Sequence, residues 1–313
     1  MTTGEHPHAG RAVTLSLIGN GLAGTAGTAA ALYPIGGTPA VVGFLRLALG
    51  AFTLIFLAPL MGGKFKNLPS LLKRPGIWVM AATSASYQAF FFASVDRAGV
   101  ATAALVTVGC IPASAGIVGW LVLRERPNVV WFIATTVAIS GLVVRSMGEL
   151  QTNDATGLLF AAIAGLGIGG YLNAAKIEIR AGGHPMQLPG VAYLLGSLGL
   201  LFIVYTELVQ VTWNAQAIGV SLFLGVITMG VANAFQILGL HGIAPGVAAT
   251  MMLVDPVTAA VLGVVVMHEE LTTQGAFGLA LVVLGLLLQS FSPGSEATKQ
   301  TSTGRHRATK QRA

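Results

Sequence analysis

The residues with the clearest capacity for chemistry lie in an apolar stretch, MMLVDPVTAAVLGVVVMHEE, at positions 251–270. Asp255 carries a carboxylate, and Pro256 directly after it removes a backbone N–H and bends a helix. A charge at the centre of a bilayer costs roughly 2.5–3.5 kcal/mol on insertion scales, so such a group normally faces a cavity or a partner. Two roles for Asp255 follow and can coexist. It caps a half-helix that restarts at Pro256, or it exchanges a proton with a substrate, since burial disfavours its charged form.

Arg46 is the second charged candidate, because it is the one basic residue deep within an apolar run. Its guanidinium could hold a substrate carboxylate or neutralise Asp255. The alternative is a side chain that snorkels, or that pairs with loop carbonyls near the outer membrane interface.

Two prolines, Pro112 and Pro256, lie at equivalent places in two apolar runs. A proline within a helix leaves a backbone carbonyl without its intrahelical partner. We therefore expect a break in both helices, with carbonyls freed toward a cavity, and we assign both prolines to coupling or gating together with Asp255 and Arg46. Tight helix packing is the alternative.

Polar side chains within the apolar runs form the next group. Ser84 and Gln88 share a helical face, as do Asn233 and Gln236. Each could instead join two helices, a bond worth about 0.6 kcal/mol on average in membranes. As a set they predict a polar chamber for substrate, lined by Asn20, Ser84, Tyr87, Gln88, Asn173, Asn233 and Gln236. The aromatic residues expected nearby are Trp78, Tyr87, Phe91 and Tyr171, and they suit a zwitterionic or neutral molecule with an apolar portion.

The elements that carry these side chains are helices that cross a membrane. Hydrophobic residues make up 54% of the 313 residues and charged residues 9%, whereas a soluble domain carries roughly 25% charged residues. Charges recur at intervals of about 20 residues, the length that spans a bilayer. Ten spans are predicted, at 12–33, 38–61, 76–95, 99–123, 128–146, 156–175, 187–206, 217–239, 246–267 and 272–291.

The ten spans divide into two similar halves. A shift of 144 residues places Pro112 on Pro256, Glu125 on Glu269 and GNGLAG near GLGIGG. Each half contains an odd number of spans, so the second copy enters the membrane upside down, as in many transporters. The predicted organisation is an N-terminal tail (1–11), two five-helix repeats (12–148 and 156–291) and a disordered basic tail (292–313). The fold class is therefore an all-α polytopic membrane protein with two inverted repeats.

The basic residues predict the orientation. With the N-terminus in the cytoplasm, Arg97 and Arg145 lie outside; apart from Arg46, the remaining 14 of the 17 Lys and Arg residues lie inside. This asymmetry satisfies the positive-inside rule and places both termini in the cytoplasm. Because the basic residues occupy loops and a tail, nucleic acid is not an expected partner. Membrane lipid is one, and a homodimer is left open.

Several local motifs have ordinary structural explanations. GNGLAG and GLGIGG fit a dinucleotide pattern, but neither follows a strand, so we expect their glycines to let helices pack closely. Glu125 and Glu269 each open the last helix of a half, where a negative charge suits the helix N-terminus. The single Cys110 permits no internal disulfide, and the six histidines lack metal-ligand spacing. Neither a metal nor a cofactor is expected.

Two segments, ASVDRAGVATAALVTVGCIPASAGIVGWLVLRE and LGLHGIAPGVAATMMLVDPVTAAVLGVVVMHEE, resemble the two repeats of EamA-type transporters of the drug/metabolite transporter superfamily. GFLRLALGA around Arg46 is similar to the second helix of that family. The resemblance implies a basket of ten helices, with a cavity lined by the first, third, fourth, sixth, eighth and ninth. A departure is the residue before the terminal Glu, which is Arg124 or His268 where the family often has Gly.

The resemblance implies a secondary transporter of small organic solutes in the cell's inner membrane. The expected activity is export of amino acids or related metabolites by alternating access, with proton coupling through Asp255 left open. A facilitated-diffusion carrier and an exporter of drugs or toxic compounds are alternatives with the same fold. A membrane-embedded enzyme is the alternative from another class, and Asp255 has no second carboxylate in the spans to support it.

Overall fold

The computed structural model describes residues 7–33, 35, 37–98, 100–124, 127–146, 154–240, 243, 245–268 and 272–290. The predicted helix-opening residues Glu125 and Glu269, and the tail 292–313, lie outside these ranges. Within them every regular element is helical. The helices are α1 (Pro7–Leu32), α2 (Pro39–Leu57), η1 (Ala58–Met61), η2 (Phe65–Asn67), α3 (Leu68–Leu71), α4 (Pro75–Ala98), α5 (Val100–Leu123), α6 (Val129–Ser146), α7 (Ala155–Arg180), α8 (Gln187–Gln210), α9 (Ala215–Leu222), η3 (Phe223–Val231), α10 (Ala232–Leu240), α11 (Pro245–Met251), α12 (Val254–Val266) and α13 (Thr273–Ser290).

The described helices confirm a polytopic membrane protein. Six helical segments are long and apolar enough to cross a bilayer, and α6 and α13 contain shorter apolar helices. Large apolar side chains such as Phe202, 89% exposed, cover the outside of the bundle, as expected for a surface that faces lipid. The count of ten spans stays a prediction.

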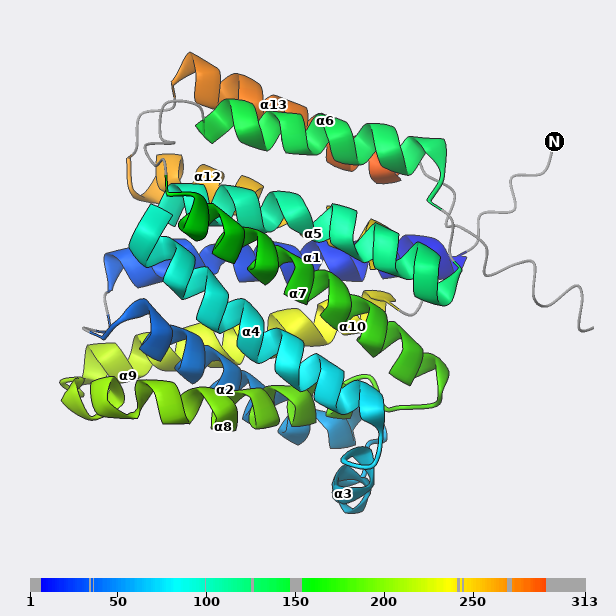
Figure 1. The fold of residues 1–313 in the computed structure, drawn as a ribbon, viewed down its shortest axis with the longest axis vertical. Coiled ribbons are helices and arrows are strands. Elements are labelled where there is room, and N and C mark those ends of the chain that lie inside the picture. The colour runs from blue at the N-terminus through cyan, green and yellow to red at the C-terminus, as the bar shows by residue number, and fades with distance from the viewer. Residues whose placement is uncertain are drawn as a thin grey trace, which may run out of the picture.

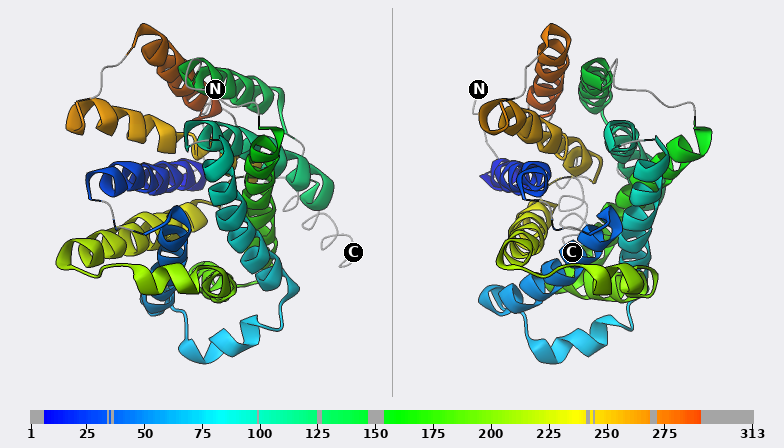
Figure 2. Two further views of the ribbon diagram at one scale, coloured as in Figure 1. Left: turned by 60° about the vertical axis from the view of Figure 1, so that its left-hand side comes forward. Right: turned by 90° about the vertical axis from the view of Figure 1, so that its left-hand side faces the viewer.

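The helices pack in pairs along the bundle. Figure 1 shows α6 beside α13 at one edge and α2 with α8 at the opposite edge. Between these edges α1 packs against α10 and α12, while α7 packs against α4 and α5 (Figure 2).

Two predicted spans depart from a regular α-helix. The helix across 215–240 contains the π-helical segment η3, a geometry that often marks functional sites. The predicted span 246–267 is broken between α11 and α12, where Leu253 N–H donates to the Thr250 carbonyl at 3.0 Å.

The break corrects the predicted cap at Asp255. The N-cap of α12 is Leu253, and no side chain caps the helix. Asp255 lies one residue inside the helix, because its own N–H already donates to the Met252 carbonyl at 3.0 Å. Pro256 therefore occupies the first turn, where a missing N–H costs nothing.

The expected break at Pro112 is wrong. Helix α5 continues from Val100 to Leu123 with Pro112 inside it. Hydrogen bonds to α7 hold the helix on both sides of the proline: Thr107 Oγ1 donates to the Ala161 carbonyl at 3.1 Å, and Ser114 Oγ donates to the Gly165 carbonyl at 3.2 Å.

Glycines bring the central helices close together, as the sequence predicts. A Cβ added to Gly19 or Gly24 of α1 would lie 2.6 Å from the carbonyl oxygen of Ala232 or Asp255, respectively. In α7, a Cβ on Gly165 would lie 2.5 Å from the Thr107 carbonyl oxygen. Contacts this short leave no room for a methyl group.

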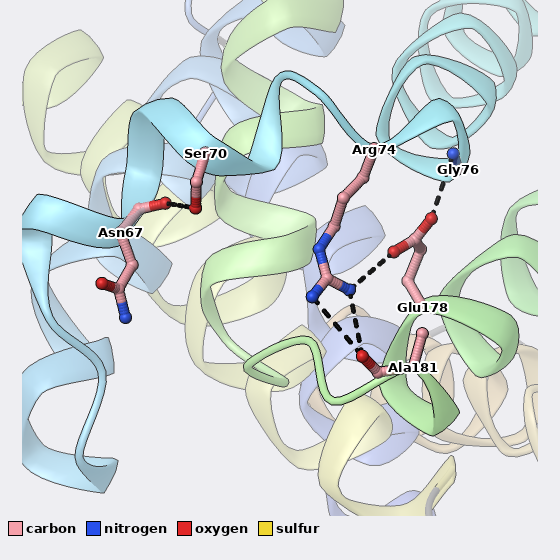
Figure 3. A network of polar contacts seen from close by, with 6 residues as sticks. All are labelled: Asn67, Ser70, Arg74, Gly76, Glu178 and Ala181. Carbon is pink, nitrogen blue, oxygen red and sulfur yellow. Dashed lines mark hydrogen bonds and ion pairs between the residues drawn. The ribbon is translucent and has the colours of Figure 1, made fainter.

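The end of the bundle formed by residues 58–76 and 178–187, here called the Arg74 end, is closed by polar contacts (Figure 3). Glu178 is buried and accepts hydrogen bonds from Arg74 Nη1 at 3.0 Å and Gly76 N–H at 3.1 Å. Arg74 also donates to the Ala181 carbonyl. The opposite end, called the Asp154 end, carries an ion pair between Arg97 and Asp154 at 3.5 Å.

We predict that Gly24→Ala destabilises the protein and that Gly27→Ala does not. The first change overpacks the contact between α1 and α12, at a cost of about 1–3 kcal/mol, whereas nothing lies within 4 Å of a Cβ on Gly27. Melting of both purified variants in detergent tests this. Equal melting temperatures would contradict the close packing.

We also predict a pH effect at the start of α7. Asp154 Oδ1 accepts hydrogen bonds from Gly157 N–H at 3.2 Å and Thr156 N–H at 2.9 Å. The Gly157 N–H is the main cause that lowers the pKa of Asp154 below its ordinary value, and Thr156 and Arg97 act in the same direction. The stabilisation is therefore complete above the ordinary pKa of aspartate and is lost as pH falls through the lowered value. Between pH 7 and pH 3 the melting temperature of the wild type should fall further than that of Asp154→Asn, whose side-chain amide oxygen still caps the helix. Parallel curves would contradict this.

Candidate functional site

A cavity of about 130 Å³ lies between the central helices. One water needs roughly 10–15 Å³, so the cavity holds more than a single water. Its walls come from α1, α2, α4, α5, α7, α8, η3, α10, α11 and α12, including residues on both sides of the α11–α12 break. Seven predicted site residues line it: Asn20, Arg46, Ser84, Tyr87, Asn233, Gln236 and Asp255.

One wall is a chain of amides and phenols that joins four helices. Gln236 Nε2 donates to Asn20 Oδ1 at 2.7 Å, so the chain links α10 to α1. Asn233 Nδ2 donates to the Tyr193 hydroxyl at 2.7 Å and to Gln236 Oε1 at 3.3 Å. Tyr171 and Tyr193 stack with their ring centroids 5.7 Å apart. Because its members bind each other, this wall is positioned before any ligand arrives.

The two charged candidates, Arg46 on α2 and Asp255 on α12, enter the cavity from different sides. The ion pairs among the described residues are Arg74–Glu178 and Arg97–Asp154, so Arg46 and Asp255 form none there. The Arg46 Nε is buried and has no hydrogen-bond partner in that part of the chain. Arg46 therefore donates to no described loop carbonyl, and its role stays a prediction.

The remaining candidates lie away from the cavity. Gln88 Nε2 donates to the Gly43 carbonyl at 3.2 Å, and Asn173 Nδ2 donates to the Ala115 carbonyl at 3.0 Å. Both side chains join helices, which is the alternative that the sequence allowed for intramembrane amides. Trp78 is also outside the cavity, where its Nε1 donates to the Leu72 carbonyl at 2.8 Å.

The two prolines do not line the cavity, but the residues four positions before them do. These are Val108, before Pro112, and Met252, before Pro256. A proline removes the N–H that the carbonyl four residues earlier would accept. Val108, the position that Pro112 affects, therefore lines the cavity, whereas the Met252 carbonyl already accepts the Asp255 N–H. A role of the two prolines in gating stays a prediction.

Sequence reasoning did not select Ser16, Tyr193 or Thr228, which also line the cavity. Ser16 lies four residues before Asn20, so helical spacing would have found it. Tyr193 lies on α8, and Arg46 and Leu47 lie on α2; neither helix belongs to the set that the family resemblance implies. The buried Lys176 and Glu178 were also missed, because the predicted span ended at 175 and α7 continues to Arg180.

Comparison with known proteins identifies the family. The model of the EamA-like transporter family matches residues 11–147 and again residues 155–291. The chain belongs to the EamA-like transporter family. It is 30% identical over 292 residues to the "Uncharacterized transporter YwfM" of Bacillus subtilis (strain 168), covering 89% of this chain and 93% of that protein. A solved structure described as "Crystal structure of protein" shares the fold with a TM-score of 0.74 and 19% identity, over 89% of this chain and 96% of the other. The predicted EamA resemblance is confirmed, and the protein is a membrane transporter.

We predict that Asn233→Ala destabilises this EamA-like protein. The change removes the donor to the Tyr193 hydroxyl and to Gln236 Oε1 and the acceptor of the Tyr171 hydroxyl. Loss of a partner by a buried polar group costs about 1–3 kcal/mol. The matched control is Ser70→Ala, which removes an exposed hydrogen bond to the Asn67 carbonyl. If Asn233→Ala melts no lower than Ser70→Ala, the amide wall does not stabilise the protein.

Proposed function

We propose that the protein is a secondary transporter of small organic solutes that works by alternating access between two inverted halves. Amino acids and related metabolites are the leading substrate class, and export is the proposed direction. The observation that carries this proposal is the position of the cavity. Its walls come from helices on both sides of the residue 148–155 connection, so a substrate bound there contacts both halves.

Helix packing supports two related halves. An exchange of α1 with α7, α2 with α8, α4 with α9–α10, α5 with α11–α12 and α6 with α13 maps each main contact onto another. The contacts of α1 with α10 and α12 become those of α7 with α4 and α5, and the α2–α8 and α6–α13 pairs map onto themselves. A pseudo-twofold axis would produce this pattern. The two segments that match the family model, residues 11–147 and 155–291, are equal in length.

The polar contacts at the Arg74 end suit a closed gate. Arg74–Glu178, the Met61–His184 contact and the bond from Gln187 Nε2 to the Lys64 carbonyl each join the first half to the second. We place this end in the cytoplasm on the positive-inside argument. Opening it requires these bonds to break, while the Asp154 end closes around the substrate.

Exchange of substrate in proteoliposomes tests the proposal. Purified protein should support counterflow of at least one labelled amino acid, and an ionophore should not abolish it. Because this exchange proceeds without an ion gradient, it distinguishes a carrier from an ATP-driven pump or an enzyme. Counterflow of no solute by folded protein, or turnover of a lipid or peptide, would contradict the proposal.

We predict that Glu178→Gln changes the rate of exchange more than the affinity. The amide can still accept one hydrogen bond, but it loses the charge that holds Arg74 at 3.0 Å. A weaker gate shifts the population from the state closed at the Arg74 end toward the state open there. The maximal rate of transport then changes more than the KM. The matched control is Asp96→Asn, an exposed carboxylate near the end of α4 that forms no ion pair with another described residue. An unchanged rate for Glu178→Gln would remove the Arg74 end from the gate.

Proton coupling is part of the proposal only through Asp255. If Asp255 exchanges a proton with substrate, Asp255→Asn should transport with no pH dependence between pH 5.5 and 8, set against a pH-dependent wild type. An Asp255→Asn variant with the wild-type pH profile would leave facilitated diffusion, which needs no titrating group.

A further inference from the structure

We propose that Arg46 and Asp255 are the two charged contacts of a zwitterion site. The guanidinium binds the carboxylate of an α-amino acid, and the Asp255 carboxylate binds its ammonium group. This inference rests on the proposed carrier function and assigns its substrate recognition to two named side chains.

The placement of both charges is the first support. Arg46 lies on α2 of the first half and Asp255 on α12 of the second, and both line the same cavity. Among the described residues the two form no ion pair with each other. Tyr87 lines the same cavity as these two residues.

The lack of partners is the second support. In the described part of the chain no hydrogen bond or ion pair reaches the side chains of Arg46 and Asp255, and the Arg46 Nε is buried without a partner. Both side chains are half-buried at the cavity, where a charge without a partner is unfavourable, and direct pairing would relieve both charges at once. Two opposite charges that line one cavity without pairing are suited to a ligand that carries both complementary charges.

Charge complementarity then selects among ligands. A zwitterion brings an anion to Arg46 and a cation to Asp255, so neither protein charge stays uncompensated. A monoanion satisfies Arg46 and places a second negative charge beside Asp255 without a cation to balance it, and a monocation does the reverse. Such uncompensated groups reject the wrong ligand more strongly than a missing contact would.

The other walls suit the rest of an amino acid. Ile111, Ile168 and Ile237 line the cavity and offer apolar contact to a side chain. The amide wall is already occupied by its own hydrogen bonds, from Asn20 through Gln236 to Asn233. Ser16 Oγ also has no partner among the described residues, but Arg46 and Asp255 are the charged groups on the cavity wall, so we assign the charged ends to them.

The test uses probes that differ only in their charged ends. Each set contains an amino acid, the amine without its carboxylate and the acid without its amine. The sets are alanine, ethylamine and propionate; leucine, isoamylamine and 4-methylpentanoate; and phenylalanine, phenethylamine and 3-phenylpropionate. Binding to full-length purified protein is measured by thermal shift and by competition against the labelled amino acid, because the single-charge probes cross lipid unaided.

The wild type should bind at least one of the three amino acids and bind its amine and acid roughly tenfold to a hundredfold more weakly, the range expected for one charge-assisted hydrogen bond. Arg46→Gln should lose affinity for the amino acid by that factor and keep affinity for the amine. Asp255→Asn should do the same and keep affinity for the acid. The matched controls are Arg11→Gln on α1 and Asp96→Asn near the end of α4, both at exposed positions.

A single charge left in the cavity could prevent folding, so the neutral double variant Arg46→Gln/Asp255→Asn is included. It should fold and bind the three members of a set within about threefold of one another. A double variant that still prefers the zwitterion by tenfold overturns the proposal. Wild-type affinity in both single variants also overturns the proposal, because the two charges would then serve only to neutralise one another.

The carrier proposal can survive without the zwitterion site. If wild-type proteoliposomes exchange labelled ethidium or uridine but none of the amino acids, the zwitterion site is wrong and the carrier function stands. If they exchange no solute at all, both proposals are wrong.

Discussion

Arg46 and Asp255 carry charges into helices whose other faces contact lipid, and a charge in hydrocarbon must be enclosed by polar surroundings. The structure meets this requirement with a cavity at the centre of the bundle instead of with a direct ion pair. The surrounding helices have to close around that space without leaving backbone groups exposed to lipid. Much of the packing can be understood from this constraint.

Close helix contacts and backbone irregularities meet around the cavity. Gly19 and Gly24 let α1 approach α10 and α12, and Gly165 does the same for α7 and α5. The cavity itself is bordered by the π-helical η3, through Thr228 and Met229, and by the break before Asp255. In a regular α-helix successive side chains are rotated by a fixed angle. The π-helical segment and the break therefore change the directions of Thr228, Met229 and Asp255 relative to a regular helix.

The sequence was sufficient to predict an all-helical membrane protein, because its long apolar runs are bounded by charge or glycine. It did not predict the short helices η1, η2 and α3. It was also sufficient to select most of the polar cavity residues, since a buried polar side chain in a membrane helix has few alternatives. Which amide lines the cavity and which joins two helices could not be predicted: Asn173 and Asn233 look equivalent in sequence, but Asn173 Nδ2 reaches the Ala115 carbonyl of α5. The same holds for the prolines. Pro112 and Pro256 occupy equivalent positions, yet only the second lies beside a break, because hydrogen bonds from Thr107 and Ser114 hold α5 against α7.

The central claim is that this cavity is a wet path for substrate. Labelling of single cysteines tests it most directly, because Cys110 is the one native cysteine and can be replaced in a Cys110→Ser background. Ala23→Cys places a thiol on the cavity wall, and Ile18→Cys places one on the 45% exposed outer face of the same helix. A membrane-impermeant thiol reagent should label the first variant in membrane vesicles, in competition with substrate, and leave the second unlabelled. An Ala23→Cys variant that resists the reagent from both faces of the membrane would contradict the account.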